Sequence, residues 1–443
     1  MSDLMMLIDI AVIVVAAKLV GQLGTRIGQP PVVGEIAVGV LLATLLRGNA
    51  IGGVVLAANV KSALHTISTL GIVLFMFTVG YHWEPNRMRG FGRVTAGIAV
   101  GSLLLPFALG TSLGFYFVER YHPTDHVQFV LFLGITMSIT ALPVLARIVE
   151  DRKLRGTVVG GVALASSAAV DGSSWAVLAV IIALAGGAPV WHLLLVPPYL
   201  LALFTLRPAL AYLARRWRGS TGFGVILAGL FLSAAATQWL GLHVVFGAFL
   251  FGAVLPSRNV PALREQMDEL ARQCHLLLLP IFFVVAALDV NLAGIGLGGI
   301  ADLGLILALA IGGKICGSYA GARVGGLRGT QAISVATLMN ARGVTELVVL
   351  QVGLQLHVLN VRLYSLLVLM ALLTTAATGP LLSLISRRAE RAGQPLTGRL
   401  SMLEPLPVLV LVDPVIVDPT VLADGLAAVP GAVIEPEGGL QAA

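Results

Sequence analysis

The chain has 443 residues, of which 57% are hydrophobic and 11% are charged, and its mean hydropathy is +0.95. A soluble domain of this size does not bury so much apolar surface, so the composition excludes a soluble protein and indicates a polytopic helical membrane protein. The first apolar run begins at Met5 without a basic region before it and is too long for a signal peptide. We therefore expect no cleaved leader.

The apolar runs predict thirteen transmembrane helices. They cover residues 5–25, 31–47, 62–81, 94–118, 127–149, 157–185, 189–214, 221–239, 241–256, 274–291, 297–322, 330–353 and 361–385. Of the 28 Lys and Arg residues, 19 lie in loops after odd-numbered helices or in the C-terminal tail, and four lie in the other loops. This asymmetry predicts an outer N-terminus and a cytoplasmic C-terminus in the cell (plasma) membrane. It also explains the net charge of +6 without nucleic-acid binding.

Two segments differ from ordinary membrane spans. Residues 258–273 carry both charge signs at an amphipathic spacing, which predicts an interfacial helix on the cytoplasmic side. We expect a transmembrane domain over residues 1–388 and an acidic, proline-containing cytoplasmic tail over 389–443. The tail from 400 onward has six acids, six prolines and no basic residue, and one strand could form at Leu406–Val412. It is too short for a nucleotide-binding regulatory domain.

The thirteen helices divide into two six-helix halves with the seventh helix as connector, and this connection would invert the second half relative to the first. Secondary transporters are commonly built in this way, with interrupted helices at matching positions. The fifth helix contains Thr140-Ala-Leu-Pro143, where the proline frees the carbonyl of Ile139. The twelfth contains Asn340-Ala-Arg-Gly343 at nearly the same depth. We therefore predict a pair of broken helices.

An acid in the middle of the sixth helix is the strongest functional signal. Asp171 lies in a long apolar run and is flanked by serines, among them Ser167 and Ser174, whose hydroxyls could hold a proton, a cation or water. A carboxylate at this depth costs about 2.5–3.5 kcal/mol on insertion scales, so it is normally kept for a function. Lys314 lies near mid-span among small residues. A buried ion pair of Asp171 with Lys314 is the structural alternative.

Arg342 and Glu346 are four residues apart in the twelfth helix, so they could pair along one face. The structural interpretation is a pair that stabilises the broken helix, and the functional one is a part of the ion site.

The sequence indicates no metal site, no cofactor and no enzymatic centre. The eight histidines and the two cysteines show no ligand spacing. Gly294-Ile-Gly-Leu-Gly-Gly299 matches a dinucleotide-binding pattern formally, but it precedes a membrane helix without a strand before it. No serine, cysteine or histidine is arranged for nucleophilic catalysis.

Eight segments in a specific order carry a family resemblance over residues 5 to about 388. They are QPPVVGEIAVGVLL (29–42), LGIVLFMFTVG (70–80), ITALPVLARIVED (139–151), SAAVDGSSW (167–175), FGAFLFGAVLP (246–256), LPIFFVVAALDVNL (279–292), GGKICG (312–317) and MNARGVTELVVLQVGL (339–354). Together they resemble the monovalent cation:proton antiporter family 2, with its Kef- and Nap-type membrane domain, in the wider sodium/proton antiporter superfamily.

The resemblance implies a thirteen-helix fold in which a scaffold domain, which forms a homodimer, holds a mobile core with two crossed broken helices. It also implies that Asp171 is the ion-binding aspartate and Lys314 the core lysine. One position departs from the family pattern, which usually has Asn, Asp or Gln immediately before the aspartate. Here Val170 takes that place, so Asp171 is the only acid at the site.

Three functional hypotheses follow. The first is exchange of Na⁺ or K⁺ for protons by alternating access, with Asp171 binding either ion and with Thr140, Ser167 and Ser174 among the ligands. The second is proton-driven export of an organic compound or an ion–ionophore complex on the same fold, which the apolar Val170 favours. The third is a membrane sensor or assembly protein without transport, which suits the acidic tail but leaves the buried charges without a role.

Overall fold

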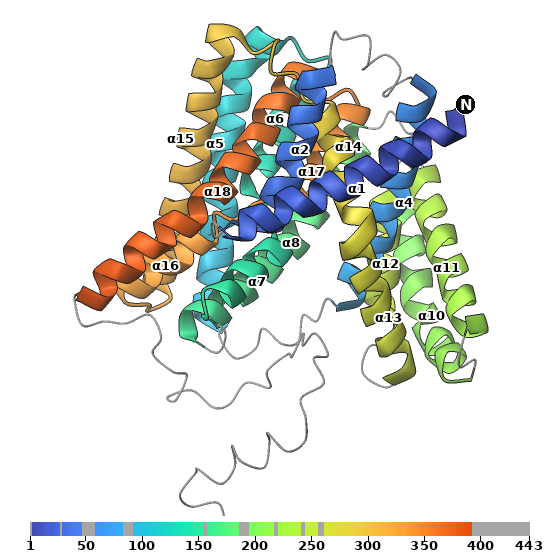
Figure 1. Cartoon of the computed structure of the whole chain (residues 1–443). Helices are drawn as coiled ribbons and strands as arrows, with labels where there is room; N and C mark the ends of the chain where they lie inside the picture. Colours follow the sequence, from blue (N-terminus) through green and yellow to red (C-terminus); the bar gives the residue numbers. More distant parts are fainter. Residues whose placement is uncertain are drawn as a thin grey trace, which may run out of the picture. The chain divides into compact units, whose positions relative to one another are not determined.

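A computed structural model describes residues 2–26, 29–46, 58–82, 92–154, 157–185, 195–216, 220–240, 244–255 and 261–391 (Figure 1). Residues 392–443 lie outside this set. Nearly all of the predicted acidic tail, and the possible strand at 406–412, therefore fall outside the described residues.

The described residues form helices that cross the membrane thirteen times, as the sequence predicted. Eight helices are long and apolar enough to span a membrane, and five shorter apolar helices supply the other passes. In chain order the elements are α1 (Ser2–Arg26), α2 (Pro31–Leu46), α4 (Ala58–His82), α5 (Gly92–Tyr121), α6 (His126–Ser138), α7 (Leu142–Asp151), α8 (Val158–Ala185), α10 (Val196–Arg216), α11 (Ser220–Trp239), α12 (Val244–Val254), α13 (Pro261–Gln273), a π-helical turn (Cys274–Leu278), α14 (Leu279–Leu288), α15 (Gly296–Val324), α16 (Gly329–Leu338), α17 (Val344–Gln355) and α18 (Val361–Arg391).

The helix predicted at residues 258–273 is present from Pro261 onward, but the prediction that it is separate is wrong. Residues 258–260 lie outside the described set. α13 runs through the π-helical turn into α14, and the three make one helix that contributes a membrane span from Leu263 to Leu288. The amphipathic spacing has another cause, because Leu263 and Met267 are buried within the helix bundle. Asp268 also accepts a hydrogen bond of 2.8 Å from the His82 ring at the end of α4. The apolar face therefore packs on protein.

The helices pack in two groups (Figure 1). The scaffold bundle consists of α1, α2, α4 and α10 to α14, and the core bundle consists of α5 to α8 and α15 to α18. The two bundles meet chiefly where α2 packs on α18 and where α14 packs on α17. Each inverted half thus contributes three passes to the core bundle: α5, α6/α7 and α8 from the first half, and α15, α16/α17 and α18 from the second.

The closest packing in the core bundle is between α5 and α15, the first helices of the two halves in this bundle. A Cβ atom added to Gly101 would lie 2.2 Å from the carbonyl oxygen of Gly317, and one added to Gly317 would lie 2.1 Å from that of Gly101. Glycine is therefore required on both sides of this contact. The close approach brings Lys314, one turn before Gly317, directly against α5.

Candidate ion-binding site at two interrupted helices

The two predicted kinks are complete interruptions that touch one another. α6 ends at Ser138 and α7 begins at Leu142, while α16 ends at Leu338 and α17 begins at Val344. The residues between them are linked directly across the crossing point. The Ala141 N–H donates to the carbonyl of Ala341 at 3.1 Å.

Two of the sequence-predicted residues have structural roles at the crossing point. The Thr140 hydroxyl donates to the carbonyl of Met339 at 3.2 Å, so it links the breaks and does not face the pocket described below. Pro143 is the second residue of α7, where its missing N–H leaves no hydrogen bond unmade. The broken helix therefore ends at Ser138 and restarts at Leu142, one residue before the proline.

Among the described residues, the core bundle has two buried cations, Lys314 and Arg342, and both bind the C-terminal end of α6. A helix C-terminus leaves carbonyls without partners and carries partial negative charge. Arg342 donates to the carbonyls of Thr136 and Met137, at 3.0 and 2.7 Å. Lys314 donates to the next carbonyl, that of Ser138. The end of α6 is thus closed by two positive side chains from the second half of the chain.

Lys314 is fully buried and is held by backbone carbonyls. Besides the carbonyl of Ser138, it donates to that of Ser102 on α5 at 3.1 Å. Among the described residues, no carboxylate lies within 4 Å of its Nζ atom. The structural alternative of a direct ion pair between Lys314 and Asp171 is therefore wrong, although the two charges remain close enough to interact electrostatically.

The predicted pair of Arg342 and Glu346 is present, with 2.9 Å between Nη1 and Oε1 and both side chains fully buried. Glu346 lies in the first turn of α17, where the helix carries partial positive charge. The Arg342 backbone is held in turn by the Thr375 hydroxyl of α18, which accepts from its N–H and donates to its carbonyl. The side-chain amide of Asn340 makes a long contact of 3.5 Å to the carbonyl of Thr374. This break is held by fixed charges and hydroxyls.

Asp171 is in the middle of α8, and its carboxyl group lies beside the first turn of α7. One carboxyl oxygen, Oδ2, accepts from the Leu142 N–H at 3.3 Å, and the side chain is 7% exposed. The other oxygen, Oδ1, is buried and has no hydrogen-bond partner among the described residues. A helix N-terminus favours an anion. The deprotonated carboxylate is thus stabilised on one side and free to take a ligand on the other.

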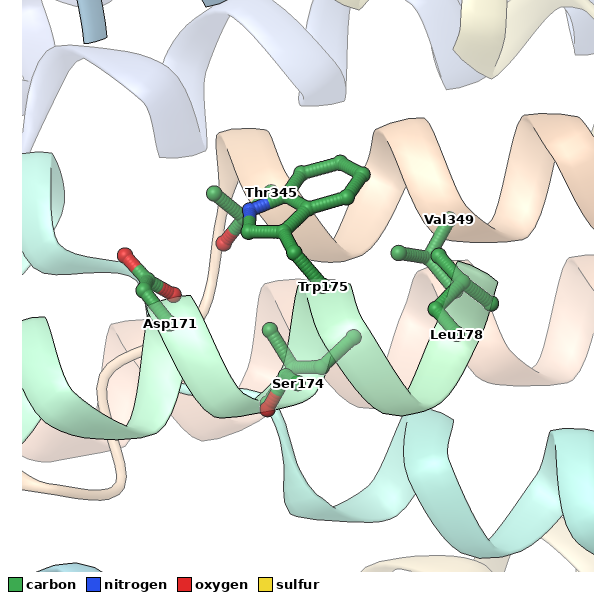
Figure 2. A pocket seen from close by; sticks show the side chains of 7 residues that line it. Asp171, Ser174, Trp175, Leu178, Thr345 and Val349 are labelled. Atoms are coloured by element: carbon green, nitrogen blue, oxygen red, sulfur yellow. The ribbon is translucent and has the colours of Figure 1, made fainter. Parts of the chain in front are cut away.

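Asp171 lines a small pocket between α8 and α17 (Figure 2). The pocket is narrow, and in this conformation its side chains leave no room for a water molecule. Besides Asp171 it is lined by Ile139, Ser174, Trp175, Leu178, Thr345 and Val349. The hydroxyls of Ser174 and Thr345 are buried and have no partner within the described part of the chain. One carboxylate oxygen and two hydroxyls are therefore available to an ion.

The sequence reasoning did not select all of these residues. Ser167 is buried one turn before Asp171, but it does not line the pocket. Thr345 and Trp175 line the pocket and were missed. The spacing contained a signal for both, because Trp175 is four residues after Asp171 on the same face of α8. Thr345 directly follows the second break, at the start of α17.

Comparison with known proteins identifies the family. Residues 11–388 match the model of the sodium/hydrogen exchanger transmembrane family. The chain belongs to this family. It is 35% identical to the Na⁺/H⁺ antiporter NhaS4 of Synechocystis, over 85% of this chain and 96% of that protein.

Other relatives are longer. The chain is 32% identical to cation/H⁺ antiporter 20 of Arabidopsis thaliana and 30% identical to K⁺/H⁺ antiporter 1 of Saccharomyces cerevisiae, over 87% and 82% of this chain. It spans about half of each, 49% and 44% of their lengths.

The fold has a counterpart among solved structures. The sodium proton antiporter MjNhaP1 of Methanocaldococcus jannaschii superposes with a TM-score of 0.58 at 15% identity, over 90% of this chain and 100% of that one. At this identity the likeness concerns the fold.

Proposed function

We propose that this protein is a secondary active transporter that exchanges a monovalent cation, Na⁺ or K⁺, for protons by alternating access. The observation that carries the proposal is Asp171, which lies beside the N-terminus of α7, has one carboxylate oxygen without a partner among the described residues, and lines a pocket with two hydroxyls that likewise have none there. Membership of the exchanger family supports it, as do relatives that are named Na⁺/H⁺ and K⁺/H⁺ antiporters.

The coupling is a competition for one carboxylate. A proton bound at Oδ1 neutralises Asp171 and leaves no charge for a cation to pair with. A bound cation takes the same oxygen, with the Ser174 and Thr345 hydroxyls as further ligands, and thereby excludes the proton. Because each conformational change carries one ion or the other, flux of the cation in one direction drives protons in the opposite direction.

The division into two bundles supports alternating access. The core bundle contains both breaks and Asp171, and it meets the scaffold bundle chiefly along α2–α18 and α14–α17. Transporters of inverted-repeat construction work by moving one bundle against the other around a site near mid-membrane. Arg342, Glu346 and Lys314 bind the interrupted helices to one another, so we infer that the core bundle moves as a unit.

The proposal also includes the orientation in the membrane and the oligomeric state. The distribution of basic loops supports an outer N-terminus and a cytoplasmic C-terminus, and the plasma membrane is the proposed location. The homodimer follows from the family resemblance, and the scaffold bundle is the part that would form it.

The main rival is proton-driven export of an organic compound. The pocket argues against it, because in this conformation its side chains leave no room for a drug-sized ligand.

The purified protein in proteoliposomes with a trapped pH dye tests the function directly. Addition of Na⁺, K⁺ or Li⁺ to one side should drive protons to that side, while vesicles without the protein should give no response. A panel of organic cations serves as the comparison. Proton movement with organic compounds but with none of the three inorganic cations would overturn the proposal.

A further inference from the structure

Trp175 forms the wall of the pocket that faces away from the core bundle. It lies on α8 one turn after Asp171, and its side chain is 5% exposed. Figure 2 shows the indole lying over the pocket beside Thr345, on the same side of α8 as Asp171. All of the pocket's lining residues, Trp175 included, belong to the core bundle.

The other side of the indole packs against the scaffold bundle. Its ring contacts two phenylalanines of α12: Phe246 edge-on at 5.6 Å, and Phe249 in a stacked arrangement at 6.5 Å. Trp175 thus separates the pocket from the scaffold bundle. Packed aromatic rings have few conformations available, so the indole cannot move aside to admit a larger ligand without disturbing both phenylalanines.

We propose that Trp175 determines specificity by limiting the size of the cation that reaches Asp171. This rests on the proposed cation–proton exchange. A carboxylate with two hydroxyls does not by itself distinguish a dehydrated metal ion from a larger organic cation. The indole makes that distinction by occupying the space that the larger ion needs. A side chain that would clash with a competing ligand is a recognised means of excluding that ligand.

The test is a selectivity ratio measured in reconstituted protein. Tetramethylammonium is a suitable large probe, because it has no dissociable proton and cannot change the internal pH by itself. We expect Trp175→Ala to raise the rate with tetramethylammonium relative to that with Na⁺ or K⁺ by roughly ten-fold. Caesium should show a smaller rise. Trp175→Phe, which keeps a ring against Phe246 and Phe249, should remain close to wild type.

Two control variants make the result interpretable. Trp239→Ala removes a tryptophan that is 60% exposed at the end of α11, so it should leave the ratio unchanged. Asp171→Asn combined with Trp175→Ala should abolish the response to every cation, which shows that the enlarged route still leads to Asp171. If Trp175→Ala does not insert stably, Trp175→Leu retains an apolar side chain and tests the same ratio.

The outcomes separate the two proposals. Wild-type protein that exchanges none of the inorganic cations would overturn the proposed function itself. Wild-type exchange with an unchanged ratio in Trp175→Ala or Trp175→Leu would overturn the role of Trp175 alone. An equal loss for all cations in these variants would also overturn it, because the indole would then be acting as a ligand through its π face and not as a size limit.

Discussion

The two interrupted helices have similar backbones but different charges. Each break places the N-terminus of a helix inside the core bundle, and each N-terminus has a carboxylate beside it: Asp171 at α7 and Glu346 at α17. Glu346 has a permanent partner, because Arg342 lies 2.9 Å away. Asp171 has a backbone N–H on one oxygen and no partner in the described residues on the other.

From this difference we infer that Glu346 has a structural role and Asp171 a functional one. A buried charge with a fixed, hydrogen-bonded counter-ion holds two segments together, and it cannot exchange its partner without a large loss of stability. A buried acid without such a partner must take a proton or a cation from outside. We infer that the second break stabilises the crossing point, and we propose that Asp171, beside the first break, is the site that changes its occupant.

Replacing the exchangeable acid should have the largest effect on transport. Asp171→Asn keeps the shape of the side chain, and its amide oxygen can still accept from Leu142. We expect cation-dependent proton movement to fall below detection while the protein inserts in wild-type amounts. The proteoliposome assay measures the first, and size-exclusion chromatography in detergent measures the second. Proton release evoked by Na⁺ or K⁺ in this variant would contradict the single-carboxylate mechanism.

Replacing the fixed cation should chiefly reduce stability. Arg342→Leu would leave Glu346 buried without a counter-ion and would remove both donors to the carbonyls of Thr136 and Met137. Loss of one partner of a buried pair costs about 3–5 kcal/mol. We therefore expect a much lower melting temperature in detergent. Glu346→Gln, which retains a hydrogen-bond acceptor for Arg342, should lower it less, and the folded fraction should still exchange cations.

If Glu346→Gln instead abolished exchange at an unchanged melting temperature, the contrast between the two breaks would be wrong. Glu346 would then be part of the ion site.

The sequence alone was enough to predict the charged residues of the site, because a charged side chain is costly to place inside a membrane. Asp171, Lys314 and the Arg342–Glu346 pair stand out because charge is expensive there, and the breaks are signalled by Pro143 and Gly343. Partners chosen by tertiary packing could not be predicted. Nothing in the local sequence indicates that Lys314 binds carbonyls of α5 and α6 rather than Asp171.

Uncharged residues that line the site are also difficult to predict from the sequence alone. Trp175 and Thr345 are signalled only by their spacing from Asp171 and from the second break, and the pocket that they share forms only when α8 and α17 are brought together. The error at residues 258–273 has a similar origin. An amphipathic pattern shows that one face is buried, but it does not show whether lipid or protein covers that face.

Lys314 should tune the competition at Asp171 without being essential to it. Its positive charge favours the deprotonated carboxylate, so Lys314→Ala should move the pH of half-maximal exchange upward. Some stability should also be lost, because the carbonyls of Ser102 and Ser138 lose their donor. Lys314→Arg restores the charge and should bring the pH profile back toward wild type. A lower melting temperature with an unchanged pH profile would show that Lys314 is structural only.

The smallest expected effect is an absence of response to membrane potential. Position 170, next to Asp171, is a buried valine and not a second acid, so one carboxylate serves each cycle. One proton moving against one monovalent cation transfers no net charge. Each net charge would respond to the potential by about 2.3 kcal/mol per 100 mV. Na⁺-driven exchange in proteoliposomes should therefore proceed at the same rate when valinomycin and K⁺ gradients impose a potential of either sign.

Lys314 is the group that could make the exchange electrogenic, by releasing a second proton in each cycle. If it released its proton whenever the cation bound, two protons would move for each cation, and a potential of one sign would accelerate exchange. Lys314→Arg distinguishes the cases, because an arginine stays protonated in proteins. We expect this variant to exchange at rates that remain independent of the potential, like the wild type. Potential-driven acceleration in the wild type that disappears in Lys314→Arg would instead identify Lys314 as a second proton carrier.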